Sequence, residues 1–130
     1  MKTLVIIIYI LLTTTACQNI EESPLPLLPA AEPSASKHNN FGIIDFTNGH
    51  YKDAFLHFKQ AYAADKTSGE IYFNLGLTLH ARGKQNDVEK QFKMARKFAQ
   101  GNSLILQSKL LHQYLDEGKY LYTYDIFKDN

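Results

Sequence analysis

Five histidines are the side chains in this sequence best suited to bind a metal ion or to transfer a proton. They are His38, His50, His57, His80 and His112. His50 and His57 are seven residues apart, and no His-Glu-x-x-His motif is present. The sequence also lacks a glycine-rich phosphate loop and a Gly-x-Ser-x-Gly nucleophile turn. We therefore expect no enzyme activity, no metal site and no cofactor.

Cys17 is the only cysteine in the sequence. A basic start at Lys2, nine largely apolar residues at positions 4–12 and small residues at positions 13–16 precede it. This order is typical of a secretory signal peptide. A helix of that length spans about 14 Å, against about 30 Å for the hydrocarbon core of a membrane. We therefore predict that residues 1–16 are removed on export rather than spanning a membrane.

The residues around Cys17 resemble a bacterial lipobox, in which the cysteine receives a diacylglyceryl thioether and becomes the acylated N-terminus. Thr14 departs from that pattern, because leucine is usual at its position. The resemblance implies a membrane-anchored lipoprotein, and Gln18 in place of aspartate implies the outer membrane, facing the periplasm. Alternatively, an ordinary signal peptidase cleaves after Ala16 and leaves Cys17 as a free thiol.

Residues 17–37 contain no glycine and all the prolines of the chain. These are Pro24, Pro26, Pro29 and Pro33. This composition, without a helical period, predicts an extended and disordered tether. Roughly 20 residues in that form reach at most about 60 Å, which would hold the rest of the chain off the membrane.

Glycine, a small residue and phenylalanine recur in one register in the rest of the chain. The copies are Gly49 with Ala54 and Phe58, Gly83 with Val88 and Phe92, and Gly118 with Thr123 and Phe127, spaced by 34 and then 35 residues. A fixed period of this length predicts stacked supersecondary units. Apolar residues at helical spacing flank the glycines, and glycine commonly ends a helix. Each unit is therefore predicted to be a helix, a tight turn and a second helix.

This pattern resembles the tetratricopeptide repeat, a family of stacked helical hairpins. The second unit matches best, through Tyr72, Asn74, Leu75, Gly76, Gly83 and Ala95. The first unit keeps Gly42 and Phe58, whereas the third has Leu111 in place of the glycine. The resemblance implies an all-α fold, a short right-handed α-solenoid of two to three hairpins over residues 38–130. Its units would span about residues 35–68, 69–102 and 104–130.

In tetratricopeptide proteins, ligands lie in the concave groove formed by the first helix of each hairpin. Carried over by position, the groove residues are Asn39, Asn40, Ile43, Phe46, Thr47, Glu70, Phe73, Asn74, Leu77, His80, Ser108, His112 and Leu115. Asn40 and Asn74 match the family's groove asparagine, whose amide can both donate to and accept from a peptide backbone. Ile43 and Leu77 stand where chaperone-binding members have polar residues, which implies an apolar peptide or helix as ligand. Alternatively, the asparagines brace the fold.

The third predicted unit is rich in aromatic residues near its end. They include Tyr120, Tyr122, Tyr124 and Phe127. Tyrosine is well suited to an interface, because its ring is apolar and its hydroxyl is polar. This end is therefore a candidate contact surface that would allow a homodimer. Alternatively, the tyrosines fold back and cap the array.

Loss of Lys2 with the signal peptide leaves 13 basic and 13 acidic residues. This balance gives no reason to expect nucleic acid as a partner. We interpret the chain as a lipid-anchored adaptor in the bacterial envelope that presents its groove to a protein partner, in pilus, secretion, outer-membrane or cell-wall assembly. The alternative is a self-associating structural lipoprotein that uses its tyrosine-rich end.

Overall fold

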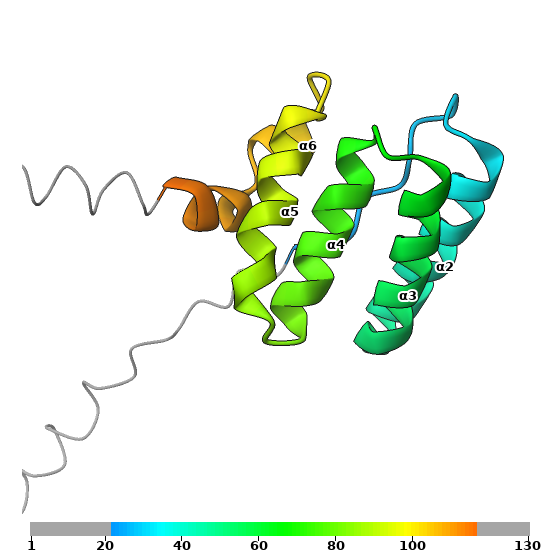
Figure 1. The fold of residues 1–130 in the computed structure, drawn as a ribbon, viewed down its shortest axis with the longest axis horizontal. Coiled ribbons are helices and arrows are strands. Elements are labelled where there is room, and N and C mark those ends of the chain that lie inside the picture. The colour runs from blue at the N-terminus through cyan, green and yellow to red at the C-terminus, as the bar shows by residue number, and fades with distance from the viewer. Residues whose placement is uncertain (1–21, 117–130) are drawn as a thin grey trace, which may run out of the picture.

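The computed structural model of the chain describes residues 22–116, and this part is all-α, as predicted. Its helices are α2 (Pro33–Thr47), α3 (Tyr51–Ala64), α4 (Gly69–Ala81), α5 (Gln85–Lys97) and α6 (Ser103–Leu106). Residues 109–116 are also helical. α2 packs against α3, α4 packs against α5, and α3 joins the two pairs through its contacts with α4 (Figure 1). Each helix within residues 22–116 is too short or too polar to span a bilayer.

The turns inside the first two hairpins have the same geometry, and a glycine allows each one. Gly49 and Gly83 have φ angles of 78° and 69°, in the left-handed region that glycine reaches without steric cost. The N–H of Gly83 donates to the carbonyl of His80, and the next N–H donates to the carbonyl of Leu79. Gly49 and the residue after it make the equivalent bonds. These are the hydrogen bonds of a Schellman motif, which confirms the predicted helix ends.

The two hairpins also repeat one close contact between their helices. A Cβ atom added to Gly42 would lie 2.6 Å from the ring of Phe58, and one added to Gly76 would lie 2.5 Å from the ring of Phe92. Both rings are fully buried. In each hairpin, the glycine of the first helix has no side chain and therefore leaves room for the phenylalanine ring of the second helix.

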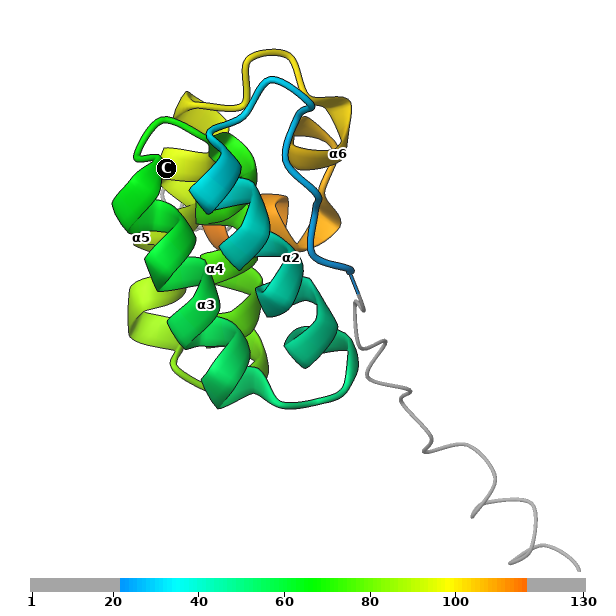
Figure 2. The ribbon, with the colours of Figure 1, turned by 90° about the vertical axis from the view of Figure 1, so that its right-hand side faces the viewer.

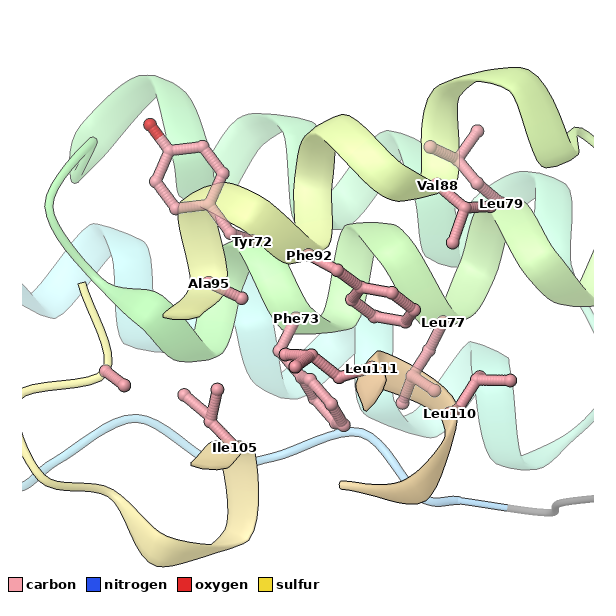
Figure 3. Close-up of a cluster of buried hydrophobic side chains, with 11 residues drawn as sticks. Tyr72, Phe73, Leu77, Leu79, Val88, Phe92, Ala95, Ile105, Leu110 and Leu111 are labelled. Carbon is pink, nitrogen blue, oxygen red and sulfur yellow. The ribbon is translucent and has the colours of Figure 1, made fainter. Parts of the chain in front are cut away.

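The third part of the array departs from this plan. α6 is four residues long and ends before Ser108, where the chain restarts as the 109–116 helix. Leu110 and Leu111 of that helix are buried against α4 and α5, in a cluster that includes Phe73, Leu77 and Phe92 (Figure 3). Leu111, where the other hairpins have glycine, therefore fills the core instead of admitting a ring. Gly118, the predicted turn glycine, lies outside the described residues.

The prediction of a disordered tether over residues 17–37 is wrong for residues 22–37. Residues 33–37 form the first turns of α2, which begins at Pro33 and is capped by the side chain of Glu32. Residues 22–31, called the N-terminal segment below, lie outside the helices and turn at residues 29–31, but they run along the hairpins, between α2 and α6 (Figure 2). An extended chain needs partners for its backbone polar groups. For Leu25, two buried asparagine side chains supply these partners, which the composition of the segment does not reveal.

Candidate functional site

The N-terminal segment is bound across the first helices of successive hairpins, where the groove was predicted. Along its course it contacts Asn39 of α2, Asn74 of α4 and the start of the 109–116 helix. We call the surface formed by Asn39, Asn74, Phe73, Leu77, Ser108 and Leu110 the groove. In α4, residues 69–79 are all buried.

Two buried asparagines hold the backbone of Leu25 in the groove. The N–H of Leu25 donates to Oδ1 of Asn74 at 2.7 Å. The carbonyl of Leu25 accepts from Nδ2 of Asn74 at 2.8 Å and from Nδ2 of Asn39 at 3.0 Å. Neither asparagine is exposed to solvent. A buried amide without a hydrogen-bond partner is costly. The backbone of Leu25 supplies such partners to both asparagines, so the pair is suited to bind an extended backbone.

Asn39, rather than Asn40, is the partner of Asn74. Asn40 is exposed, while Asn39 shares a buried stripe of α2 with Ala35 and Gly42. Consecutive residues of a helix are about 100° apart, so only one of two neighbouring asparagines can face α4. Gly42, which matches the repeat pattern, is three residues after Asn39, so helical spacing from this glycine could have identified Asn39.

The apolar side chains of the N-terminal segment pack on two core clusters. Leu25 packs on the cluster that contains Phe73 and Leu77, and Leu27 packs on the cluster that contains Ile71. Pro24 is buried, whereas Leu28 is 58% exposed. Ile43 and Phe46, also predicted as groove residues, are partly buried hydrophobic residues of these clusters. Leu25 and Leu27 therefore pack against apolar side chains of the hairpins.

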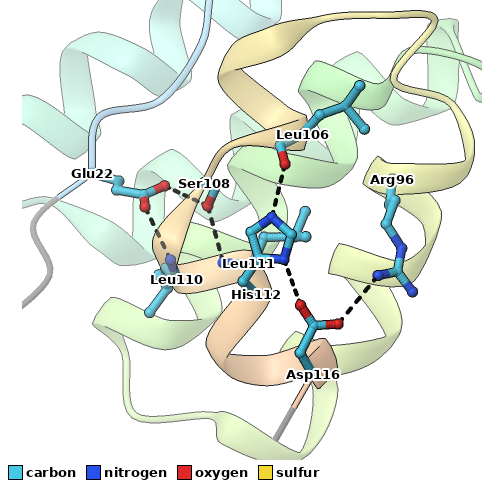
Figure 4. Close-up of polar contacts among 8 residues, drawn as sticks. All are labelled: Glu22, Arg96, Leu106, Ser108, Leu110, Leu111, His112 and Asp116. Carbon is cyan, nitrogen blue, oxygen red and sulfur yellow. Dashed lines mark hydrogen bonds and ion pairs between the residues drawn. The ribbon is translucent and has the colours of Figure 1, made fainter. Parts of the chain in front are cut away.

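Glu22, the first residue that the structure describes, lies at the start of the 109–116 helix (Figure 4). Its carboxylate accepts from Oγ of Ser108 at 2.6 Å and from the N–H of Leu110 at 3.0 Å. Oγ of Ser108 in turn accepts from the N–H of Leu111 at 3.0 Å. The first N–H groups of a helix lack partners within it, and the helix dipole favours negative charge there. Glu22 and Ser108 thus cap the 109–116 helix together, a role for Glu22 that the sequence analysis missed.

The two histidines assigned to the groove have other positions. His80 is partly buried, and its Nδ1 lies 2.9 Å from the hydroxyl of Tyr114, so it links α4 to the 109–116 helix. His112 is exposed, and its partners in Figure 4 are Asp116 and Leu106. Its Nδ1 lies 2.5 Å from Asp116, and its Nε2 lies 2.8 Å from the carbonyl of Leu106.

The hydrogen bond to Asp116, followed by the one to the Leu106 carbonyl, raises the pKa of His112 above its ordinary value. Both ring nitrogens face acceptors, and only the protonated ring can donate from both. Asp116 also pairs with Arg96 of α5 at 3.6 Å. Spacing of four residues between His112 and Asp116 was the sequence signal for this contact. The interactions of His112 and Asp116 with Arg96 and the Leu106 carbonyl join α5, α6 and the 109–116 helix, and they are not part of the groove.

The remaining histidines lie on the first hairpin around Asp45. His57 and His50 approach its carboxylate at 3.6 and 3.9 Å, and the ring of His38 stacks on that of His57. Within residues 22–116, no group of three histidine, cysteine, aspartate or glutamate side chains is placed to hold a metal ion.

A hollow of about 240 Å³ lies where the N-terminal segment turns toward α2. It is lined by Leu27, Leu28, Ala30, Ala31, Asp65, Thr67, Ser68, Glu70, Phe98, Ala99 and Gln100. Its most buried charge, Glu70, accepts from Ser68 Oγ at 2.9 Å and from Asn102 Nδ2 at 2.7 Å. Glu70 therefore braces the start of α4 against the loop before α6.

Cys17 and the aromatic residues Tyr120, Tyr122, Tyr124 and Phe127 lie outside the described residues. Comparison of the chain with protein-family models, with curated proteins and with solved structures finds no match.

Proposed function

We propose that this protein is an adaptor that binds a peptide segment of a protein partner in the groove. One observation carries the proposal: Asn39 and Asn74 hold both the N–H and the carbonyl of a single residue, Leu25. Contacts to the backbone do not depend on which side chain is bound, and recognition of extended peptides relies on such contacts. Apolar residues beside the asparagines add the surface that side chains of a ligand would cover.

We also propose that the two hairpins are tetratricopeptide units and begin a short right-handed solenoid. The repeated contact of Gly42 with Phe58 and of Gly76 with Phe92 supports this, because it reproduces one packing arrangement at the repeat distance. The ligand groove of that family lies on the first helices of the hairpins, which here are α2 and α4.

The adaptor is proposed to be exported and held by lipid at Cys17, on the outer membrane facing the periplasm. The lipobox resemblance supports this part. Cys17 is five residues before Glu22, and a chain of that length spans at most about 18 Å. With Glu22 bound at Ser108, the hairpins would therefore stay much closer to the membrane than a free tether would allow.

A groove that already holds the N-terminal segment can receive a partner only when that segment leaves. Leu25→Asp puts a charge against these apolar side chains of the hairpins and should release the segment. We expect a partner captured by crosslinking in cell envelopes to be recovered in larger amount with this variant. Adding Asn74→Ala to it should reduce the recovery.

Asn40→Ala is the matched control for this experiment, because Asn40 is exposed and adjacent to Asn39. It should leave the recovery unchanged. Equal recovery of the same protein by all the variants would show that the partner binds elsewhere.

A further inference from the structure

We infer that the groove recognises extended peptides with a carboxylate three residues before an apolar residue and a proline directly before that residue. Residues 22–28 of the chain are a built-in copy of this ligand. The inference rests on the proposed function, since it specifies the chemistry of the partner that the groove would bind.

The carboxylate requirement comes from the start of the 109–116 helix. Ser108 is 4% exposed, and it and Leu110 both donate to Glu22 from 86 and 88 residues away in the sequence. A carboxylate accepting two such bonds at a helix N-terminus is favoured over a neutral amide. This end of the groove therefore selects an acidic residue.

The required spacing between the acidic residue and the apolar residue comes from the asparagine pair, the second place where the groove holds the segment. Asn39 and Asn74 bind the backbone of Leu25, three residues after Glu22. Pro24 lies between these two places and is buried. Proline suits this position, because it has no N–H to satisfy and its φ angle is restricted. Together these contacts set the register of the ligand.

The apolar requirement follows from the packing of two leucines of the segment. Leu25 and Leu27 pack on the two core clusters, whereas Pro26 and Leu28 are exposed. The ligand pattern is therefore an acidic residue, any residue, proline, an apolar residue, any residue and a second apolar residue.

The segment and a partner peptide must compete for the groove. A ligand joined by a short linker has an effective concentration in the millimolar range. A free peptide of the same sequence should therefore bind poorly to the intact chain. Partner peptides must either bind more tightly than the segment or be held nearby.

The test uses the intact chain, purified in detergent, with a protease site inserted after Ala30 in the exposed turn. Cleavage after folding converts the segment into a separate ligand that can exchange. A fluorescent peptide with the sequence of residues 22–28 should bind to the cut protein, and at least about tenfold more weakly to the uncut protein. Circular dichroism checks that the cut protein stays helical.

Three variant peptides separate the possible outcomes. Replacing the glutamate with glutamine should weaken binding about tenfold. Replacing the residue equivalent to Leu25 with aspartate should abolish binding, while alanine at the Pro26 position should leave it unchanged. If no peptide binds the folded, cut protein, the proposed function fails. If the glutamine peptide binds as well as the glutamate peptide, only the inferred pattern fails.

The uncut chain provides a second measurement that does not depend on surviving cleavage. Glu22→Gln should increase the hydrogen-exchange rate of the Leu25 amide about tenfold, because the segment opens more often. Ser23→Ala is the control, since Ser23 is exposed and adjacent. An unchanged exchange rate in Glu22→Gln would overturn the carboxylate requirement.

Discussion

Nδ2 of Asn74 donates to Oδ1 of Asn39 at 2.9 Å, joining α4 to α2 through two amides without solvent exposure. The second hydrogen on the same nitrogen is donated to the carbonyl of Leu25. Each amide therefore bonds both to the other and to the N-terminal segment. This arrangement makes the segment part of the folded structure as well as the occupant of the groove.

Asn74→Ala should destabilise the protein by about 2 to 4 kcal/mol. It leaves the N–H of Leu25 and Oδ1 of Asn39 without their partners in a buried site, and each such loss costs about 1 to 3 kcal/mol. Urea unfolding followed by circular dichroism measures the change. Asn40→Ala should cost less than about 0.5 kcal/mol, because Asn40 is exposed. Similar losses in both variants would contradict the assignment of Asn39 as the partner.

Phe92→Ala should largely unfold the hairpins. Phe92 is fully buried, with its ring centre 5.7 Å from that of Phe73, and truncation of a packed phenylalanine costs about 3 to 5 kcal/mol. A domain of this size has a total stability of about 5 to 10 kcal/mol. Leu56→Ala is a control on a half-exposed residue of α3. A loss below about 1 kcal/mol in a Phe92→Ala melt would contradict this packing.

The paired helices were predictable because their determinants are local or repeat at a fixed distance. Gly49 and Gly83 mark turns through backbone conformations that other residues reach only at a cost. Gly42 and Gly76 mark close contacts at the same offset from the turns. Periodicity carries this information within a single sequence.

Binding of the N-terminal segment was not predictable in the same way. Its hydrogen bonds to the hairpins join residues 14 to 88 positions apart, so no local pattern in the sequence marks them. Four prolines without glycine are equally compatible with a free tether and with an extended strand whose backbone is bound by side chains. At the break before residue 109, the carboxylate that completes the helix cap likewise comes from Glu22, 86 residues away from Ser108.

Gly76→Ala and Gly83→Ala should both destabilise the second hairpin, for different reasons. The added methyl group of Gly76→Ala meets the Phe92 ring at 2.5 Å, and overpacking of this kind costs about 1 to 3 kcal/mol. Gly83→Ala has open space around the new methyl group but a φ angle of 69°, which costs about 1 to 2 kcal/mol.

A second substitution distinguishes the two causes. Phe92→Leu removes part of the ring that Gly76→Ala would strike, so in combination the two changes should cost less than the sum of their separate effects. Phe92→Leu and Gly83→Ala should be additive. Additive losses in both pairs, measured by urea unfolding, would mean that Gly76 is not required for the ring contact.

The interaction of His112 with Asp116 should make part of the stability depend on pH. The pKa of His112 is raised in the folded state, so the protonated ring binds more favourably there than in the unfolded chain. This contribution is fully present below the unfolded pKa, near 6.5, and is lost as pH rises through the higher folded pKa. Since the side chain is 47% exposed, water screens the pair and the effect should stay below about 1 kcal/mol.

His112→Gln isolates this contribution from that of the other histidines. The variant should lose stability relative to the unmodified chain at pH 5.5, and the difference between the two proteins should shrink by pH 8.5, with urea unfolding as the measurement. The NMR titration of the His112 ring should have its midpoint above about 6.5. A difference between the proteins that stays constant with pH would mean that the ring acts only through packing. A difference that grows with pH would contradict the protonated state, because a neutral ring cannot donate to both Asp116 and the Leu106 carbonyl.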